Sequence, residues 1–432
     1  MLRRDGDLLS LLPAEVYRRE SGRIGLSRRS IVYVNAPDLV RGILADPEGI
    51  FPKSDLMTGA LAPLVGNSIF VSSGAVWRRQ RRMIDPAFSQ LRLAAAFPDM
   101  AAALDDTEAR LDAHAAKGEA FSLDLAMSHL TADIICRTVF STSLRSQAAR
   151  DVFDAFTVFE RNVAHVEIPR LIFARPFAEI PHQPGVLAAC ALIRRHLDAL
   201  VETHAGATPF DDIAAAVMGA ADSETGAPFS RAEVLDQLGV LFLAGHETTA
   251  STLIWAFYII ARQPELAARI RAEIAGVAGS DAIGFEHARR LSFVRNVFRE
   301  TLRLYPPITF IPRVATRATS IGGMHVKRGA MVMIAPWIIH RHHSYWRDPD
   351  AFDPDRFSPA REGELVPGAY IPFGQGPRVC VGAAFATTEA VLILARLVRR
   401  YDFSVRDPEK VRPIARLTTR PLEQIICTAR RV

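Results

Sequence analysis

A ten-residue stretch, Phe373–Gly382, carries the side chains whose chemistry is easiest to name. Its sequence, FGQGPRVCVG, places Cys380 in a loop with three glycines and a proline, directly before a segment of helical composition. Free N–H groups at a helix start favour a thiolate, so we expect the pKa of this thiol to be lowered. A thiolate could ligate a metal or act as a nucleophile, but a nucleophile needs a neighbouring base and the loop holds no histidine. Arg378 is suited to the anionic edge of a cofactor.

A long helix is predicted in the second half of the chain. Ser230 and Glu233 have the spacing of a capping box, and the helical pattern then continues to about Gln263, where Pro264 stops it. At about 1.5 Å per residue such a helix is roughly 50 Å long, which is enough to cross a whole domain.

The middle of this helix reads AGHETT, residues Ala244–Thr249. A glycine and an acid are both unfavourable inside an apolar helix, and such broken rules are expected at functional sites. Gly245 would allow a flat ring or dioxygen to approach the backbone, while Glu247 and Thr248 are adjacent groups that can handle protons. A helix kink with a satisfied buried carboxylate is the alternative interpretation.

The cysteine loop resembles the haem-binding loop of cytochrome P450 monooxygenases, of the soluble bacterial type. All its fixed positions are present, namely Phe373, Gly376, Arg378, Cys380 and Gly382. The resemblance implies haem b (iron protoporphyrin IX) as the cofactor, with Cys380 as the axial iron ligand, which pushes electron density toward the bound oxidant. It also makes Arg378 a propionate partner and Phe373 and Gly382 further haem contacts. The alternative is a buried cysteine in a structural loop.

The AGHETT motif resembles the oxygen-activating motif of the same family. In that motif an acid–alcohol pair delivers protons during oxygen activation. The resemblance makes Thr248 the residue that donates to dioxygen, Glu247 its link to solvent protons, and Ala244 a haem contact.

An arginine-rich helix is predicted around Trp77 and Arg81, which are four residues apart and share one face. A charge run of this kind is usually a solvated face. The resemblance instead makes Trp77 and Arg81 haem-propionate partners, together with Arg313. The neighbouring arginines are expected to point outward and to form part of a basic face for an acidic electron donor: Arg78, Arg79 and Arg82.

Glu300 and Arg303 lie one turn apart in another predicted helix. On spacing alone an ordinary surface pair would be favoured. The resemblance implies a buried structural trio, completed by Arg356 of the DPDRF segment, Asp353–Phe357.

The residues expected to line a substrate pocket are apolar. They indicate a hydrophobic compound such as a terpenoid, a fatty acid or an aromatic molecule. The predicted pocket residues are Ile69, Phe70, Leu243, Ile308, Phe310 and Leu417.

The remaining pattern predicts the elements that position these residues. The expected fold is mainly α with a small β region and a long central helix, as the resemblance implies. We expect strands at 31–37, after Pro307 and in MVMIAPWIIHR, helices at 38–44 and 293–305, and loops at 53–73 and 415–421.

Composition is that of a large globular protein. The chain has 432 residues, of which 49% are hydrophobic and 23% charged, and no linker or repeat divides it, so one domain over residues 1–432 is expected. Four cysteines without metal or disulfide spacing fit a reducing cytoplasm. The longest apolar run contains His246 and Glu247 and therefore predicts a buried helix, not a membrane anchor. A net charge of +5 without an arginine–aromatic patch argues against nucleic acid.

The predicted function is insertion of one oxygen atom of O2 into a hydrophobic substrate, by C–H hydroxylation or epoxidation. The chain shows no flavin or iron–sulfur segment, so we expect electrons from an iron–sulfur ferredoxin with its reductase, and a monomer. Two alternative functions remain open. A haem-thiolate peroxygenase would not need the Glu247–Thr248 pair, and a haem-based gas sensor would need an output module.

Overall fold

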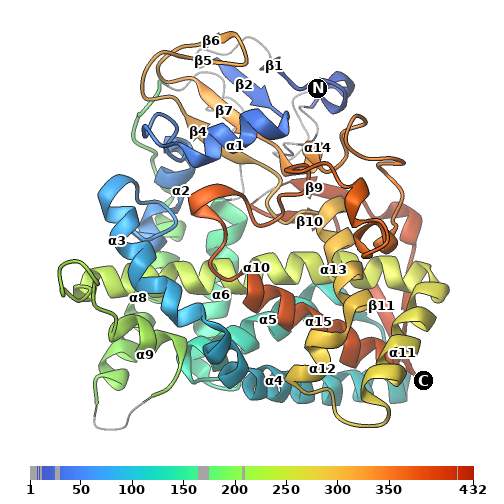
Figure 1. The fold of residues 1–432 in the computed structure, drawn as a ribbon. Coiled ribbons are helices and arrows are strands. Elements are labelled where there is room, and N and C mark those ends of the chain that lie inside the picture. Colours follow the sequence, from blue (N-terminus) through green and yellow to red (C-terminus); the bar gives the residue numbers. More distant parts are fainter. Residues whose placement is uncertain are drawn as a thin grey trace.

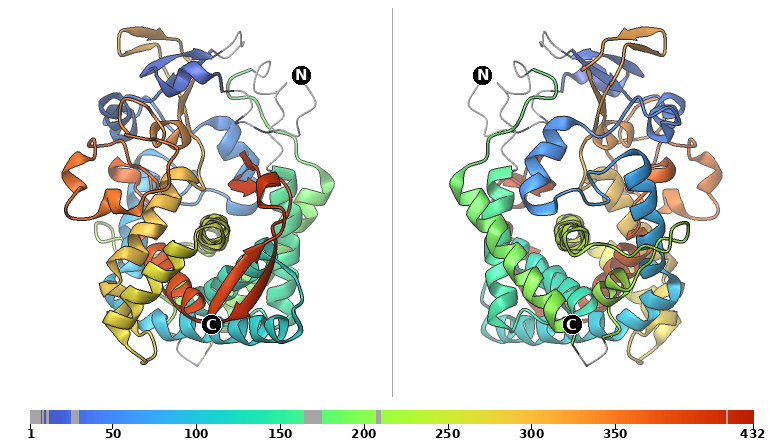
Figure 2. Two further views of the ribbon diagram at one scale, coloured as in Figure 1. Left: turned by 90° about the vertical axis from the view of Figure 1, so that its right-hand side faces the viewer. Right: turned by 90° about the vertical axis from the view of Figure 1, so that its left-hand side faces the viewer.

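The computed structural model describes residues 7, 9, 12–24, 30–163, 175–206, 210–415 and 417–432. Helix α10 (Arg231–Arg262) crosses the middle of the molecule and is seen end-on in both views of Figure 2, surrounded by other helices. The mainly α fold with a small β region is confirmed (Figure 1). The other helices are α1 (Pro37–Ala45), α2 (Asp55–Val65), α3 (Gly74–Ile84), α4 (Gln90–Lys117), α5 (Leu123–Phe140), α6 (Gln147–Val163), α8 (Pro184–His204), α9 (Ile213–Met218), α11 (Pro264–Ala278), α12 (Phe285–Arg290), α13 (Ser292–Leu304), α14 (Pro336–Ile339) and α15 (Ala383–Arg400).

The ends of α10 follow the predicted signals. Ser230 caps the helix: its Oγ accepts from the N–H of Glu233 at 3.3 Å, and the Glu233 carboxylate accepts from the Ser230 N–H at 2.8 Å. The helix ends directly before Gln263 and Pro264. Most of its residues between these ends are buried on every side, which is typical of a helix in the core of a large protein. Among the described helices, none is long and apolar enough to cross a lipid bilayer.

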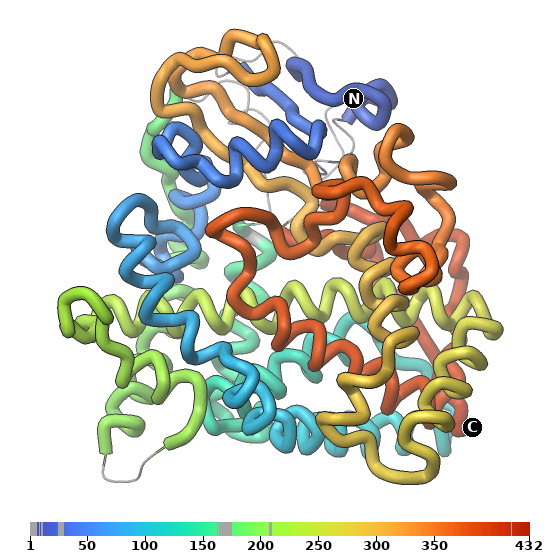
Figure 3. The backbone as a smooth tube through the Cα atoms, viewed as in Figure 1, coloured from blue at the N-terminus to red at the C-terminus, as the bar shows by residue number. Residues whose placement is uncertain are grey.

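The main β region lies beside the helices, at the top of Figure 1. Its sheet has the order β1-β2-β7-β4, with β2 parallel to β7 and the other pairs antiparallel. Figure 3 shows the blue N-terminal segments and the orange segments lying together there, although hundreds of residues separate them. The strands of this sheet are β1 (Ser21–Ile24), β2 (Ile31–Val34), β7 (Met331–Ile334) and β4 (Ile311–Val314).

Shorter strands form three small sheets. The C-terminal segment predicted as a loop back to the pocket folds as a hairpin of β9 and β10, with Arg416 outside the described residues. The strands are β3 (Phe121–Ser122), β11 (Ile426–Arg431), β8 (Tyr401–Val405), β5 (Thr319–Ile321), β6 (Met324–Val326), β9 (Pro413–Ala415) and β10 (Thr419–Pro421).

The predicted loop at 53–73 is wrong over its first half, where α2 forms. Gly59 and Pro63 suggested a broken period, yet both lie inside the helix. The glycine allows close packing there, because a Cβ at this position would lie 2.9 Å from the end of the Ile180 side chain. Leu61 and Leu64 are buried in the main core, so tertiary packing outweighs the poor local propensity.

Candidate active site

The cysteine loop is a tight turn held against α1. A short 3₁₀ turn, Gly376–Arg378, precedes Cys380, whose N–H donates to the Phe373 carbonyl oxygen at 2.9 Å. Gly376 has φ +75°, and a Cβ there would lie 3.1 Å from the carbonyl oxygen of Leu44 at the end of α1. Gly382 follows as the N-cap of α15. Glycine at 376 therefore permits both the backbone conformation and the close approach to α1.

The thiol of Cys380 is exposed to the cavity, and the protein around the cavity desolvates it. Burial raises the pKa of Cys380, while the Gly382 N–H and the charges of Arg81 and Lys53 act in the opposite direction. Our expectation of a lowered thiol pKa at this helix start is therefore wrong for the protein without its cofactor. Desolvation of the thiolate outweighs the N–H groups of a helix end.

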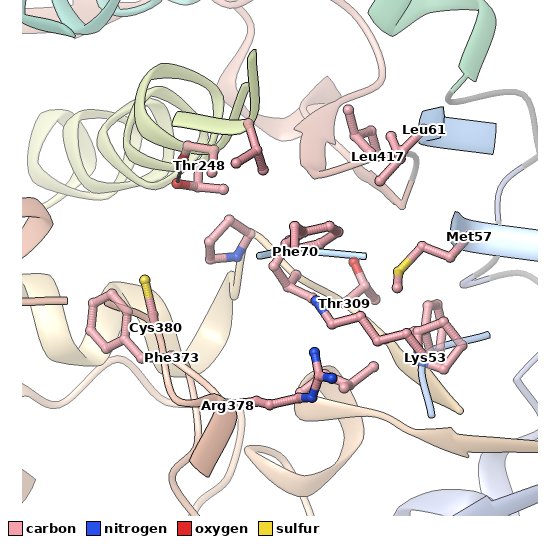
Figure 4. Close-up of a pocket in the computed structure, with 18 of the residues that line it drawn as sticks. Lys53, Met57, Leu61, Phe70, Thr248, Thr309, Phe373, Arg378, Cys380 and Leu417 are labelled. Carbon is pink, nitrogen blue, oxygen red and sulfur yellow. Dashed lines mark hydrogen bonds between the residues drawn. The ribbon is translucent and has the colours of Figure 1, made fainter. Parts of the chain in front are cut away.

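A cavity of about 810 Å³ lies between the cysteine loop and α10. Figure 4 shows Thr248 and Cys380 on opposite sides of it, with Arg378 on the cysteine side. Ala244 is exposed to this space although it sits in the middle of the central helix. The wall thus combines a thiol on one side with a small residue and a hydroxyl on the other, which leaves room for a flat group between them.

Three cations converge on one end of the cavity. Arg313, Arg378 and Lys53 all line it, and none forms an ion pair with a carboxylate in the described part of the chain. Burial lowers the pKa of all three, to about 10 for Arg313 and Arg378 and well below the usual value for Lys53, and repulsion from neighbouring arginines adds to the lowering for Arg313 and Lys53. Nη1 of Arg378 is buried without a hydrogen-bond partner. Unpaired buried cations of this kind fit the propionate carboxylates of a haem.

Trp77 and Arg81 lie at the same end. The guanidinium carbon of Arg378 lies 4.5 Å from the centre of the Trp77 ring. Arg81 lines the cavity, but it donates to the Val379 carbonyl oxygen at 2.6 Å and pairs with Asp85 at 2.6 Å. Arg81 therefore ties α3 directly to the cysteine loop. Sequence reasoning missed Lys53, whose Nζ lies 3.4 Å from the Phe70 ring centre (Figure 4).

The AGHETT motif is divided between the cavity and the core. Thr248 faces the cavity and donates its hydroxyl hydrogen to the Ala244 carbonyl oxygen at 2.8 Å. Gly245 also lines the cavity, and a Cβ there would lie 2.4 Å from Cδ1 of Ile135 on α5. The glycine is therefore required by the packing of α5 on α10, in addition to any approach of a ligand.

Glu247 lies behind the cavity wall and does not line it. Its Oε1 accepts from Thr418 Oγ1 at 2.5 Å and from Arg420 Nε at 2.8 Å, and its other oxygen also pairs with Arg420. Although burial opposes it, Arg420 lowers the pKa of Glu247. The carboxylate is thus satisfied and buried, as the alternative interpretation of the motif expected. Arg420 was missed, because its contact spans 173 residues of sequence.

Glu300, Arg303 and Arg356 form a buried network. Arg303 makes two hydrogen bonds to the Glu300 carboxylate, at 2.7 and 2.8 Å, and Arg356 donates to it at 3.3 Å. The side chains of Glu300 and Arg303 are fully buried, so the surface pair favoured by spacing alone is excluded. Arg303 also donates to the carbonyl oxygens of His340, Pro349 and Ala351. The network joins α13 to the segments before the cysteine loop.

Leu243 alone among the predicted pocket residues does not line the cavity. It is 7% exposed and packs in the main core, whereas Leu241 lines the cavity. Near this point α10 presents Leu241, Ala244 and Thr248 to the cavity, and Leu243 faces another direction. The other predicted residues all line the cavity: Ile69, Phe70, Ile308, Phe310 and Leu417.

The predicted basic face of α3 is largely neutralised within the chain. Arg79 pairs with Glu233 at 2.6 Å, and Arg82 pairs with Asp222 and Glu224, each at 2.9 Å. The side chains of Arg79 and Arg82 are thus partly exposed, at 24% and 32%, but carboxylates of the same chain offset their charges. Arg78 is exposed and forms no ion pair with a described residue.

Comparison with known proteins agrees with this arrangement. The family model "Cytochrome P450" matches residues 19–428. Cyclooctatin synthase of Streptomyces melanosporofaciens is 31% identical over 433 residues, covering 99% of this chain and 90% of that protein. Cyclooctat-9-en-7-ol 5-monooxygenase of the same organism is 33% identical over 407 residues, covering 92% and 85%.

Solved structures show the same fold. A crystal structure of the cytochrome P450DA heme domain superposes with a TM-score of 0.84 at 24% identity, covering 96% of this chain and 90% of that one. Family model, relatives and fold agree over nearly the whole chain. The chain belongs to the cytochrome P450 family.

Proposed function

We propose that this monooxygenase oxidises a bulky unsaturated hydrocarbon of terpenoid type, or its mono-alcohol. Similar proteins are named as a monooxygenase of cyclooctat-9-en-7-ol and as an oxygenase of pentalenene, which by their names are an alkenol and an alkene. The observation that carries the proposal is the apolar wall of the cavity, part of which Figure 4 shows. That wall includes Met57, Leu61, Phe70, Ile308, Phe310 and Leu417.

In this proposal each part of the cavity has a separate task. Cys380 ligates the haem iron, while Arg313, Arg378 and Trp77 hold the propionates. When bound, the haem supplies oxygen activation, in which two electrons and two protons accompany each oxygen atom inserted and the other oxygen leaves as water. The protein excludes bulk water with its apolar wall, and Thr248 presents a hydroxyl on the side opposite the thiol. Thr248 must rotate away from the Ala244 carbonyl to donate elsewhere.

We propose that an iron–sulfur ferredoxin with its reductase supplies the electrons. We further propose that the chain is monomeric and cytoplasmic and forms one haem domain over residues 1–432. The net charge of +5 supports an acidic partner. Arg78 on α3 is available for such contact, and α3 touches the cysteine loop through Arg81. Arg79 and Arg82 contribute less, because internal carboxylates already neutralise them.

The substrate class is tested by titrating the purified haem protein with four probes of similar carbon number. These are a cyclic alkene, its mono-alcohol, a linear fatty acid and a polar diol. We expect the alkene and the alcohol to shift the haem absorbance toward high spin and to give products that contain labelled oxygen from O2. A spin shift with the fatty acid alone would contradict the proposed substrate class.

The role of Thr248 is tested with Thr248→Ala. Loss of a positioned proton donor costs about 10²–10⁴-fold in the step it serves, so product per electron pair should fall steeply while reductant use continues as peroxide release. Thr252→Ala is the matched control, one turn further along α10 in the same cavity wall. Equal coupling in the wild type and Thr248→Ala would remove Thr248 from the proton path.

A further inference from the structure

A chain of two threonine hydroxyls runs from the wall of the cavity to the C-terminal hairpin. Thr309, in the segment between α13 and β4, lines the cavity, whereas Thr419 at the start of β10 does not. Their Oγ1 atoms lie 2.8 Å apart, and Thr419 Oγ1 lies 2.6 Å from the Pro306 carbonyl oxygen. Neither threonine is among the residues assigned so far to the haem or to proton supply.

The Pro306 carbonyl fixes the direction of both hydrogen bonds. A threonine hydroxyl has one hydrogen and two lone pairs, whereas a carbonyl oxygen can only accept. The bond from Thr419 to Pro306 therefore uses the one hydrogen of the Thr419 hydroxyl. In the contact between the two threonines Thr419 can then only accept, so Thr309 donates its own hydrogen there.

Thr419 is held in this arrangement by its backbone and by its burial. Its carbonyl oxygen accepts from Ser251 Oγ at 2.7 Å and from Trp255 Nε1 at 2.8 Å, and its N–H donates to the Pro307 carbonyl oxygen at 3.0 Å. Thr419 is fully buried, so a hydroxyl turned away from Pro306 would have no solvent to bond. Leaving a buried donor unpaired is costly, and the order of the two bonds is therefore kept.

The oxygen of Thr309 keeps an acceptor capacity that no described residue uses. Its own hydrogen is donated away from the cavity, and its neighbours Ile308 and Phe310, which also line the cavity, are apolar. Figure 4 shows Lys53 and Phe70 in the same part of the cavity, but Lys53 Nζ lies over the Phe70 ring, 3.4 Å from its centre. A lone acceptor in an apolar wall favours a ligand that brings a donor.

Two hydroxyls of α10 in the same wall are less committed. Thr248 donates to the Ala244 carbonyl oxygen at 2.8 Å, and Thr252 donates to the Thr248 carbonyl oxygen at 3.0 Å. Each of these bonds lies within one turn of a single helix, and rotation of the side chain frees the hydrogen. Thr309 instead passes its hydrogen to a side chain that is itself fixed. Among these three hydroxyls, Thr309 is therefore the permanent acceptor.

We infer that Thr309 is a specificity-determining residue that accepts a hydrogen bond from a hydroxyl group already present on the substrate. The inference rests on the proposed function and decides between its two substrate forms, the alkene and the mono-alcohol, in favour of the alcohol. A carbonyl or ether oxygen at the same place brings a second acceptor against Thr309 and makes no hydrogen bond. The reaction that supplies the substrate must therefore leave a hydroxyl group on the hydrocarbon, and hydroxylation by this protein then gives a diol.

The test replaces Thr309 without disturbing the buried chain behind it. Thr309→Val removes the hydroxyl and keeps the branched shape, and Thr419 keeps its hydrogen bond to Pro306, so no buried donor is left unpaired. Thr309→Ala removes the same acceptor and takes its place if the valine variant does not fold. Thr309→Ser retains the hydroxyl. Thr252→Val is the matched control, because it removes another hydroxyl from the wall of the same cavity.

Binding is measured on the haem-loaded proteins with three ligands that share one unsaturated ring skeleton: a mono-alcohol, its methyl ether and the corresponding ketone. Titrations followed by the haem spin shift and by calorimetry give the dissociation constants. One hydrogen bond of ordinary strength corresponds to about a 2- to 13-fold preference for the alcohol over the ether and the ketone. We expect this preference in the wild type, in Thr309→Ser and in Thr252→Val, and its loss in Thr309→Val.

The outcomes separate the role of Thr309 from the proposed substrate class. A preference for the alcohol that is equally large in the wild type and in Thr309→Val would overturn the inference, as would tighter binding of the ether or the ketone by the wild type. Ring compounds that bind without any preference for the alcohol would leave the proposed substrate class standing and remove Thr309 from recognition. If no ring compound binds and a linear fatty acid does, the proposed substrate class fails and the inference fails with it.

Discussion

Replacing Arg313 should stabilise the protein without haem and weaken haem binding. Arg313 on β4 is 5% exposed and forms no ion pair in the described residues. Among the described residues its guanidinium donates only to the neighbouring Pro312 carbonyl oxygen, at 3.2 Å. Arg313→Met keeps an unbranched apolar side chain in place of the arginine stem and removes the charge, so little apolar packing is lost.

The size of both effects follows from the surroundings of Arg313. Burial, with repulsion from Arg378, lowers its pKa from the ordinary guanidinium value to about 10, so its charged form costs roughly 3 kcal/mol in the folded protein without haem. Arg313→Met removes that cost. With haem bound, the variant lacks a charge-assisted hydrogen bond to a propionate, worth about 1.5–3 kcal/mol. Haem affinity should therefore fall by about 10- to 150-fold.

Two measurements separate these opposite effects. Denaturant unfolding of haem-depleted protein gives the change in the free energy of unfolding, and the rate of haem transfer to an excess of acceptor protein gives the change in retention. Arg347→Met is the control, since the Arg347 side chain is 89% exposed and does not line the cavity. A haem-depleted Arg313→Met protein that is less stable than the wild type, together with unchanged haem retention, would refute the assignment of these cations to a cofactor.

Substitutions at three further positions test the framework and the pocket. Arg303→Leu should lower the free energy of unfolding by about 3–5 kcal/mol, because it leaves the buried Glu300 carboxylate with only the weaker Arg356 contact. Arg303→Lys should cost less. An unchanged denaturation midpoint for Arg303→Leu would contradict a structural network. Leu243→Ala should lower the free energy of unfolding by about 2–5 kcal/mol without changing the substrate-induced spin shift of the haem. Leu241→Ala should change that spin shift, because Leu241 lines the cavity. A spin shift changed by Leu243→Ala and not by Leu241→Ala would show that the wrong face of α10 has been assigned to the cavity.

Elements with strong local signals could be predicted from the sequence. The capping box of Ser230 and the stop at Pro264 set the ends of α10 closely, because both act within one turn. Helix α2 could not be predicted, since Gly59 and Pro63 are unfavourable locally and only packing against the core stabilises it.

The site shows the same division between local and distant causes. The sequence motifs predicted which residue types line the site. They did not predict which face of α10 borders the cavity, so Leu243 was predicted as a pocket residue, whereas Leu241 lines the cavity. Lys53 and Arg420 were missed because their contacts join segments far apart in sequence. The thiol pKa was predicted in the wrong direction, because a local helix-start argument cannot include burial by the rest of the fold.

The central claim is that Cys380 ligates the iron of a haem held between the cysteine loop and α10. The most direct measurement is the absorbance spectrum of the purified protein after reduction and exposure to carbon monoxide, beside that of Cys380→Ser. We predict that the wild type gives the band typical of cysteinate-bound ferrous haem and that Cys380→Ser does not. A wild-type protein that binds haem without that band, or a Cys380→Ser protein that retains it, would contradict the account.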